Sequence, residues 1–150
     1  MRNTFFGILF FLLSAATFGA VIAPPDTLTV TDPYKGRFYA QDHGITIVMN
    51  LYCEDIIIPG YTFLGPTNGY MKGDSSRHLY GVWILTSFVM KPDHAVLRFS
   101  NDLGSESQTV NFYSQDDGTF RYHAIGGNEV RKSSGKKLIK IAGDMTFIRR

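Results

Sequence analysis

Closely spaced turn residues divide the second half of this chain into short apolar runs. Turn segments at 91–94, 115–118, 126–128 and 133–135 separate the runs, which follow one another about every 8–12 residues, the spacing of all-β domains. The Asp-Gly pair at 117–118 is a strong signal for a tight β-hairpin. Beyond the N-terminal segment, no run repeats apolar residues at helical spacing for more than one turn. The sequence therefore predicts an all-β fold of antiparallel hairpins with few or no helices.

The composition indicates a folded chain with an aromatic core. Hydrophobic residues make up 44% and charged residues 19% of the 150 residues, which excludes a disordered chain. Aromatic residues make up 14%, and 15 glycines supply turns. We expect a small antiparallel barrel or a two-sheet sandwich. We favour the barrel because consecutive hairpins close simply and closure removes exposed edges.

Residues 1–23 have the layout of a secretory signal peptide. A basic residue, Arg2, precedes an apolar run over 5–13 and then small residues, and cleavage is expected within 16–23. The apolar run is shorter than the roughly 20 residues that span a bilayer, so we predict no stable membrane anchor. The remaining chain, 24–150, is predicted to be a single β domain.

Cysteine usage bears on the compartment. Cys53 is the only cysteine, so the chain forms no internal disulfide and offers no cysteine after the signal for a lipid. Small secreted domains usually depend on several disulfides. We therefore predict a disulfide-free protein of the bacterial periplasm, with secretion as the second choice. Cys53 continues the apolar parity of the strand predicted at 45–52, which predicts a buried thiol.

Residues 79–90 are predicted to form the central strand. They contain no charge and no proline and are rich in β-branched and aromatic side chains, which is typical of a strand covered on both faces. We expect this strand to be the most buried one, with the only tryptophan, Trp83, as the hub of the core. The earlier strands are predicted at 27–31, 35–40, 45–52 and 55–58.

Residues 60–77 are irregular, yet they contain more apolar surface than a solvated linker needs. One interpretation is a hairpin with strands at 61–64 and 69–72. Another is a loop that covers a pocket or presents aromatic side chains to a partner, and both can hold together. Binding hot spots favour tyrosine, tryptophan and arginine. The partner-binding residues that we predict are Tyr61, Phe63, Tyr70 and Arg77.

Charge is unevenly distributed along the chain. Residues 24–60 contain two basic and five acidic residues, a net −3, whereas residues 126–150 contain seven basic and two acidic residues, a net +5. The C-terminal hairpins are therefore predicted to form a basic edge, with Arg131, Lys132, Lys136, Lys137 and Lys140. Lysines on a solvated strand edge prevent aggregation, which is the favoured interpretation. The alternative is a docking surface for an acidic partner or an anionic polymer. Nucleic acid is not expected, because no binding motif is present.

No pattern in the sequence supports catalysis or a cofactor. The four histidines lie far apart in the sequence, at His43, His78, His94 and His123. None pairs with another at metal-ligand spacing, and His123 falls on the solvated side of its strand. The adjacent acids at 54–55 and 116–117 would point to opposite faces of a strand, unlike a glycosidase pair. We predict no enzyme activity, no metal and no cofactor. A Cys53-dependent hydrolase is a disfavoured alternative.

Gly81, Val82 and Trp83 resemble the Gly-x-Trp strand of lipocalins. In that family the motif lies on the first barrel strand, whereas here at least two predicted strands precede it and the rest of the family pattern is missing. The resemblance implies a barrel that carries one small apolar ligand. We favour the alternative, in which Trp83 and its neighbours fill the core.

These observations favour a protein-binding module of the periplasm. Such a module would inhibit or neutralise another exported enzyme, as an immunity protein does against a delivered cell-wall-targeting toxin, or as an inhibitor does against a cell-wall hydrolase. Small size, an export signal, the aromatic segment 60–77 and the separated charge are all consistent with this function. The alternatives are a lipocalin-like carrier of a small apolar ligand and an enzyme of unknown type.

Overall fold

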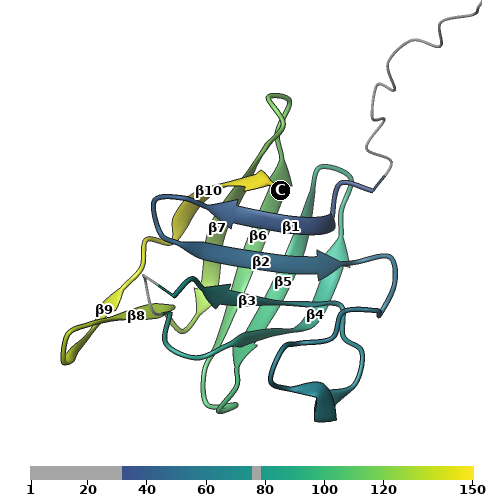
Figure 1. The fold of residues 1–150 in the computed structure, drawn as a ribbon. Coiled ribbons are helices and arrows are strands. Elements are labelled where there is room, and N and C mark those ends of the chain that lie inside the picture. The colour runs from purple at the N-terminus through teal and green to yellow at the C-terminus, as the bar shows by residue number, and fades with distance from the viewer. Residues whose placement is uncertain (1–31, 76–78) are drawn as a thin grey trace, which may run out of the picture. The chain divides into compact units, whose positions relative to one another are not determined.

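The computed structural model describes residues 32–75 and 79–150. In these ranges the chain forms ten strands and one short 3₁₀ helix, η1 (Figure 1). In chain order the elements are β1 (Lys35–Ala40), β2 (Ile45–Asn50), η1 (Thr62–Leu64), β3 (Gly69–Gly73), β4 (Trp83–Met90), β5 (His94–Asn101), β6 (Ser107–Ser114), β7 (Thr119–Gly127), β8 (Arg131–Ser134), β9 (Lys137–Lys140) and β10 (Asp144–Arg149).

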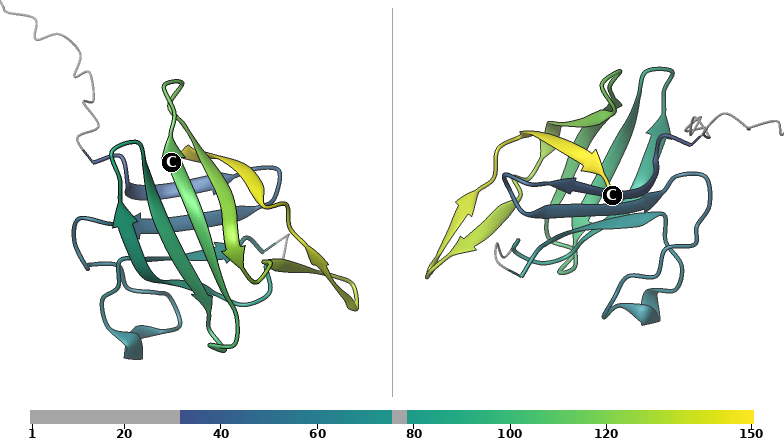
Figure 2. Two further views of the ribbon diagram at one scale, coloured as in Figure 1. Left: turned by 180° about the vertical axis from the view of Figure 1, so that it is seen from behind. Right: turned by 45° about the horizontal axis from the view of Figure 1, so that its top comes forward.

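Eight of these strands close into an antiparallel barrel. The order around the barrel is β1-β10-β7-β6-β5-β4-β3-β2, so strands that follow one another in the chain are neighbours, apart from the β8–β9 insertion. The barrel is closed where Phe38 and Tyr39 of β1 pair with Arg149 and Ile148 of β10. In Figure 1, strands β1–β3 cross in front of β5–β7, and the β8–β9 hairpin projects from the barrel in all views (Figures 1 and 2). The predicted all-β fold is confirmed, and of the two architectures it is the barrel.

Side chains that alternate along the strands fill the barrel. Ile45, Ile47 and Met49 of β2 point inward and are all 0% exposed. The aromatic rings of Phe38, Phe112, Phe120 and Phe147 form a contacting cluster inside the barrel, with ring centroids 4.7–5.9 Å apart. Such dense packing of large rings is the main source of stability for a barrel of this size, since burial removes apolar area from water.

One buried polar pair lies within this core. The hydroxyl of Tyr122 donates a hydrogen bond to Oε1 of Gln108, and Nε2 of Gln108 donates to the carbonyl of Asn128 at 3.1 Å. Tyr122 is 1% and Gln108 is 6% exposed. Because burial disfavours the charged phenolate, it raises the pKa of Tyr122 above the usual tyrosine range.

The prediction that residues 79–90 form the most buried strand is wrong. The strand β4 begins only at Trp83, and its second half is largely exposed, with Val89 at 58% and Met90 at 47%. A bulge between Leu85 and Ser87 shifts the register, and the outer face of an antiparallel wall has no second layer to cover it. The most buried strand is β2. Trp83 itself is 1% exposed and belongs to the core, as expected.

Two further predictions between β2 and β3 are wrong. In the predicted strand 61–64, Thr62–Leu64 forms η1 instead, and β3 pairs with β2 and β4 instead of with that segment. The strand expected at 55–58 is reduced to one isolated bridge between Ile56 and Thr67.

The predicted buried thiol is also wrong, because Cys53 is exposed. The side chain of Asn50 explains why: its Oδ1 accepts hydrogen bonds from the backbone N–H groups of Tyr52 and Cys53, at 3.1 and 3.2 Å. This side-chain turn ends β2 at Asn50, so the alternation of the strand no longer applies to Cys53.

Some predictions fall outside the described residues. They are the signal peptide at 1–23, the edge strand at 27–31, and the side chains of Arg77 and His78. In the part of the chain that the structure describes, no helix has the length and apolar character needed to cross a bilayer.

Candidate functional site

The long connection between β2 and β3 is held in place by its own hydrogen bonds. The backbone groups of Ile56 and Thr67 exchange two bonds, of 2.9 and 2.8 Å, and Nδ2 of Asn68 donates to the carbonyl of Asn50 at 3.0 Å. Ile58, in the middle of this connection, is 1% exposed. The connection therefore presents η1, at the lower end of the molecule in Figure 1, from an anchored base.

The carboxylate of Asp102 joins three segments at this end. The hydroxyl of Tyr61, next to η1, donates a hydrogen bond of 2.5 Å to Oδ2 of Asp102. The backbone of Gly81 packs against the other oxygen, where an added Cβ would lie only 2.6 Å from Oδ1. Gly81 also has a φ of +77°, which a residue with a side chain adopts only with strain. Asp102, which directly precedes Leu103, thus bonds to Tyr61 and lies close to the backbone of Gly81.

These three segments expose large apolar side chains. Phe63 is 79% exposed, Leu103 is 68%, Leu64 is 43% and Tyr80 is 41%. The rings of Tyr61 and Phe63 lie 6.1 Å apart. We call these five residues, Tyr61, Phe63, Leu64, Tyr80 and Leu103, the Asp102 surface. The hydrogen bond to Asp102, with smaller contributions from burial and from the negative charge, raises the pKa of Tyr61.

Of the four partner-binding residues predicted from the sequence, two lie on the Asp102 surface, one is buried and one lies outside the described residues. Tyr61 and Phe63 lie together on the Asp102 surface. Tyr70 is not available to a partner: it belongs to β3, it is 3% exposed, and burial raises its pKa. Arg77 lies outside the described residues. Sequence reasoning missed Tyr80, Asp102 and Leu103, although an apolar leucine within the polar turn after β5 is a visible signal.

The five predicted basic-edge residues do lie close together. They belong to the β8–β9 hairpin and its turn, residues 131–140, which we call the basic ribbon. Lys136, Lys137 and Lys140 are exposed, while Arg131 and Lys132 at its base are half-buried. Nζ of Lys140 forms an ion pair of 2.6 Å with Glu129. Leu138 and Ile139 on the same ribbon are 45% and 41% exposed.

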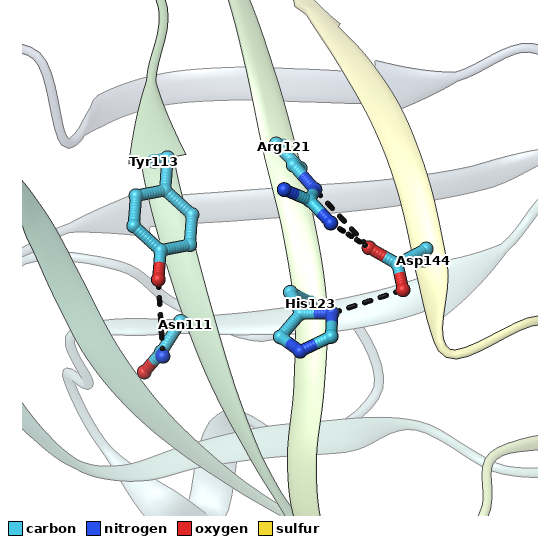
Figure 3. Close-up of polar contacts among 5 residues, drawn as sticks. All are labelled: Asn111, Tyr113, Arg121, His123 and Asp144. Carbon is cyan, nitrogen blue, oxygen red and sulfur yellow. Dashed lines mark hydrogen bonds and ion pairs between the residues drawn. The ribbon is translucent and has the colours of Figure 1, made fainter.

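A third group of polar side chains lies on the outer wall of the barrel (Figure 3). Oδ1 of Asp144 accepts hydrogen bonds from Nε and Nη2 of Arg121, at 3.1 and 2.9 Å, and its Oδ2 lies 2.9 Å from Nδ1 of His123. The bonds from His123 and then Arg121 lower the pKa of Asp144. Beside them, Nδ2 of Asn111 donates to the hydroxyl of Tyr113 at 3.2 Å.

This wall group has the histidine and carboxylate of a catalytic dyad but lacks a nucleophile. Within the described residues, His123 has no hydroxyl or thiol partner, and its side chain is 40% exposed to solvent. A shallow hollow of about 260 Å³ beside it is lined by Arg121, Asp144 and His43, among other residues. Nucleophilic catalysis needs a base within hydrogen-bond reach of a nucleophile, so the wall group is best described as a surface ion-pair cluster. No three histidine, cysteine or acidic side chains in the described ranges are placed to hold a metal ion.

The fold and these surfaces define a class: a small up-and-down β-barrel with a filled interior whose candidate sites all lie on its outside. No protein-family model, no curated protein and no solved structure matches this chain.

Proposed function

We propose that this protein is an exported protein-binding module that inhibits or neutralises another exported enzyme through the Asp102 surface. The observation that carries the proposal is Phe63, which is 79% exposed on a short helix whose base is anchored by hydrogen bonds. Aromatic side chains are enriched in protein–protein interfaces, so an exposed ring on an ordered surface supports this proposal.

Preorganisation is the physical reason why this surface suits binding. A flexible loop loses conformational entropy when it docks, whereas a loop already fixed by the bonds of Tyr61, Thr67 and Asn68 has little left to lose. Phe63 and Leu103 project furthest, while Leu64 and Tyr80 are about half exposed. Exposed aromatic and aliphatic side chains on an ordered segment are the kind of side chains that form the core of an interface.

The carrier function has less support. It requires an internal cavity of a few hundred cubic ångströms lined by aromatic side chains. In this barrel the inward rings pack against each other, with Phe38 and Phe120 at 4.7 Å and Phe112 and Phe120 at 5.5 Å between centroids. The two described hollows, of about 260 and 340 Å³, lie outside the barrel.

The test compares two double variants of the exported protein. The wild type is used to capture its partner from periplasmic extract, and binding and inhibition of the captured enzyme are then measured with purified proteins. We expect Phe63→Ala/Leu103→Ala to weaken binding by at least about 2 kcal/mol, roughly 30-fold, because hot-spot truncation has that cost. Val89→Ala/Met90→Ala removes two other exposed apolar side chains, 58% and 47% exposed at the end of β4, and should leave binding unchanged.

Two results would contradict the proposal. One is that the Phe63/Leu103 variant binds and inhibits as the wild type does while its circular dichroism shows an intact barrel. The other is that the control variant loses binding to the same extent, which would show that the loss reflects general surface hydrophobicity.

A further inference from the structure

The basic ribbon has a charge pattern that the folded barrel does not use. Residues 130–143 contain five basic residues and no acidic residue. Lys140 pairs with Glu129, but Lys136 and Lys137 have no ion-pair partner among the described residues. Within the protein these charges repel one another, so they lower the stability of the ribbon unless an external anion compensates for them.

The two faces of the ribbon are nearly equivalent. Cross-strand partners share a face, so Arg131 and Lys140 lie on one face together with Ser133 and Leu138. The other face holds the pairs Lys132 with Ile139 and Ser134 with Lys137. Each face therefore carries two cations, one serine and one exposed aliphatic side chain, with Leu138 at 45% and Ile139 at 41% exposure, and on the first face Glu129 pairs with one of the cations, Lys140.

The base of the ribbon is fixed to the barrel. The carbonyl of Val130 accepts a hydrogen bond of 2.9 Å from the N–H of Ile141, and these two side chains are 3% and 9% exposed. The carbonyl of Arg131 accepts a bond of 2.8 Å from the N–H of Tyr80. The ribbon beyond this base projects from the barrel as a separate two-stranded sheet, visible on both views in Figure 2.

We propose that the basic ribbon docks the protein reversibly on an anionic phospholipid surface. Positive charge selects an anionic surface, since each lysine or arginine near such a membrane contributes to binding. The aliphatic side chains favour lipid over a hydrated anionic polysaccharide, which offers them no apolar contact. The equivalent faces favour lipid over an acidic protein, because a headgroup layer surrounds both faces of an inserted ribbon and a protein surface contacts only one.

This docking uses other side chains than the Asp102 surface, to which the ribbon base is joined only through the backbone N–H of Tyr80, and it goes beyond the proposed function. It predicts that the ribbon concentrates the module at a membrane while Phe63 remains the partner contact. Variants of one surface should therefore leave the activity of the other surface intact.

The experiment is sedimentation of the purified exported protein with vesicles of phosphatidylglycerol and phosphatidylcholine in equal amounts, and with vesicles of phosphatidylcholine alone. We expect binding to the anionic vesicles only. Raising the salt from about 0.1 M to about 1 M should abolish it, because the Debye length falls from about 10 Å to about 3 Å.

Four double variants, all made in the same exported form of the protein, separate the contribution of charge to vesicle binding from that of apolar contact. Lys136→Gln/Lys137→Gln should lower the partition coefficient about fivefold per removed charge. The matched control Lys35→Gln/Lys91→Gln removes two exposed cations elsewhere and should lower the coefficient much less. Leu138→Ser/Ile139→Ser should lower it roughly tenfold, because the inserted apolar area is lost. Val89→Ser/Met90→Ser is its control.

Three outcomes would overturn the proposal. They are equal binding to both kinds of vesicle, equal losses in the ribbon variants and their controls, and loss of a protein partner in the ribbon variants with vesicle binding unchanged. The last outcome would assign the ribbon to an acidic protein instead. Loss of inhibition by the Phe63/Leu103 variant, with vesicle binding retained, would leave this proposal and the proposed function both standing.

Discussion

Tyr122 shows how a single buried hydroxyl couples the stability of this barrel to pH. At alkaline pH the unfolded chain releases the tyrosine proton near pH 10, whereas the buried Tyr122 retains it, because burial raises its pKa. The unfolded state then binds fewer protons than the native state, so the free energy of unfolding falls as pH rises. The expected slope is about 1.4 kcal/mol per pH unit for each such tyrosine.

We expect Tyr122→Phe to have two opposing effects. Near neutral pH it should cost about 1–3 kcal/mol, because Oε1 of the buried Gln108 loses its donor. Above about pH 10 the decline in stability should become less steep, since one raised tyrosine pKa is removed. Denaturant unfolding at pH 8 and at two alkaline values measures both effects. Parallel pH profiles for the variant and the wild type would contradict this account.

At the residue scale, the sequence indicates which side chains are polar and on which face of a strand they are expected. It does not indicate the distant partners that decide their final positions. Asn50 could not be recognised as the side chain that ends β2, because its bonds to Tyr52 and Cys53 depend on the turn itself. Tyr70 has the composition of a contact residue, yet it is covered in the folded chain. His123 was correctly placed on the solvated face, but its partner Asp144 lies 21 residues further on, beyond any local pattern.

At the element scale, Gly127 ends β7 at the point where the chain leaves the barrel for the basic ribbon. Its φ is +87°, and an added Cβ would lie 2.2 Å from the carbonyl oxygen of Ser107. The neighbouring Gly126 has no atom within 4 Å of an added Cβ. The two adjacent glycines therefore differ in whether the backbone tolerates a side chain.

We expect Gly127→Ala to destabilise the protein by roughly 2–4 kcal/mol, because it combines backbone strain with a contact that only a backbone shift relieves. Gly126→Ala should change the stability by less than about 1 kcal/mol and can be slightly stabilising, since alanine restricts the unfolded chain. Thermal unfolding of both variants measures the difference. Similar losses of stability at the two positions would show that the positive φ of Gly127 and its close approach to Ser107 are not what makes this position sensitive.

Strands were predicted correctly where turn residues bound them, and incorrectly where packing between distant segments determines their length and exposure. The hairpin of β6 and β7 follows from its Asp-Gly turn, and β1 matches its predicted range of 35–40. The high apolar content of residues 79–90 led to the wrong prediction that they form the most buried strand, because the exposure of β4 depends on its place in the barrel wall. The sequence indicated the basic residues of the ribbon and two residues of the Asp102 surface, Tyr61 and Phe63, but not Tyr80 or Leu103, because the position of that surface depends on a bond between the distant residues Tyr61 and Asp102.

At the scale of the whole molecule, β10 closes the barrel, and we expect the closed barrel to unfold as one cooperative unit. Phe147 of β10 is 0% exposed and its ring lies 5.9 Å from both Phe112 and Tyr122, whereas the adjacent Ile148 is 42% exposed. Phe147→Ala should therefore cost about 3–5 kcal/mol, and Ile148→Ala less than about 1 kcal/mol.

Trp83 fluorescence reports on β4, across the barrel from β10, and circular dichroism reports on all strands. If the closed barrel unfolds as one unit, both signals shift together in Phe147→Ala. A shift in circular dichroism that leaves the Trp83 transition in place would mean that β10 detaches independently.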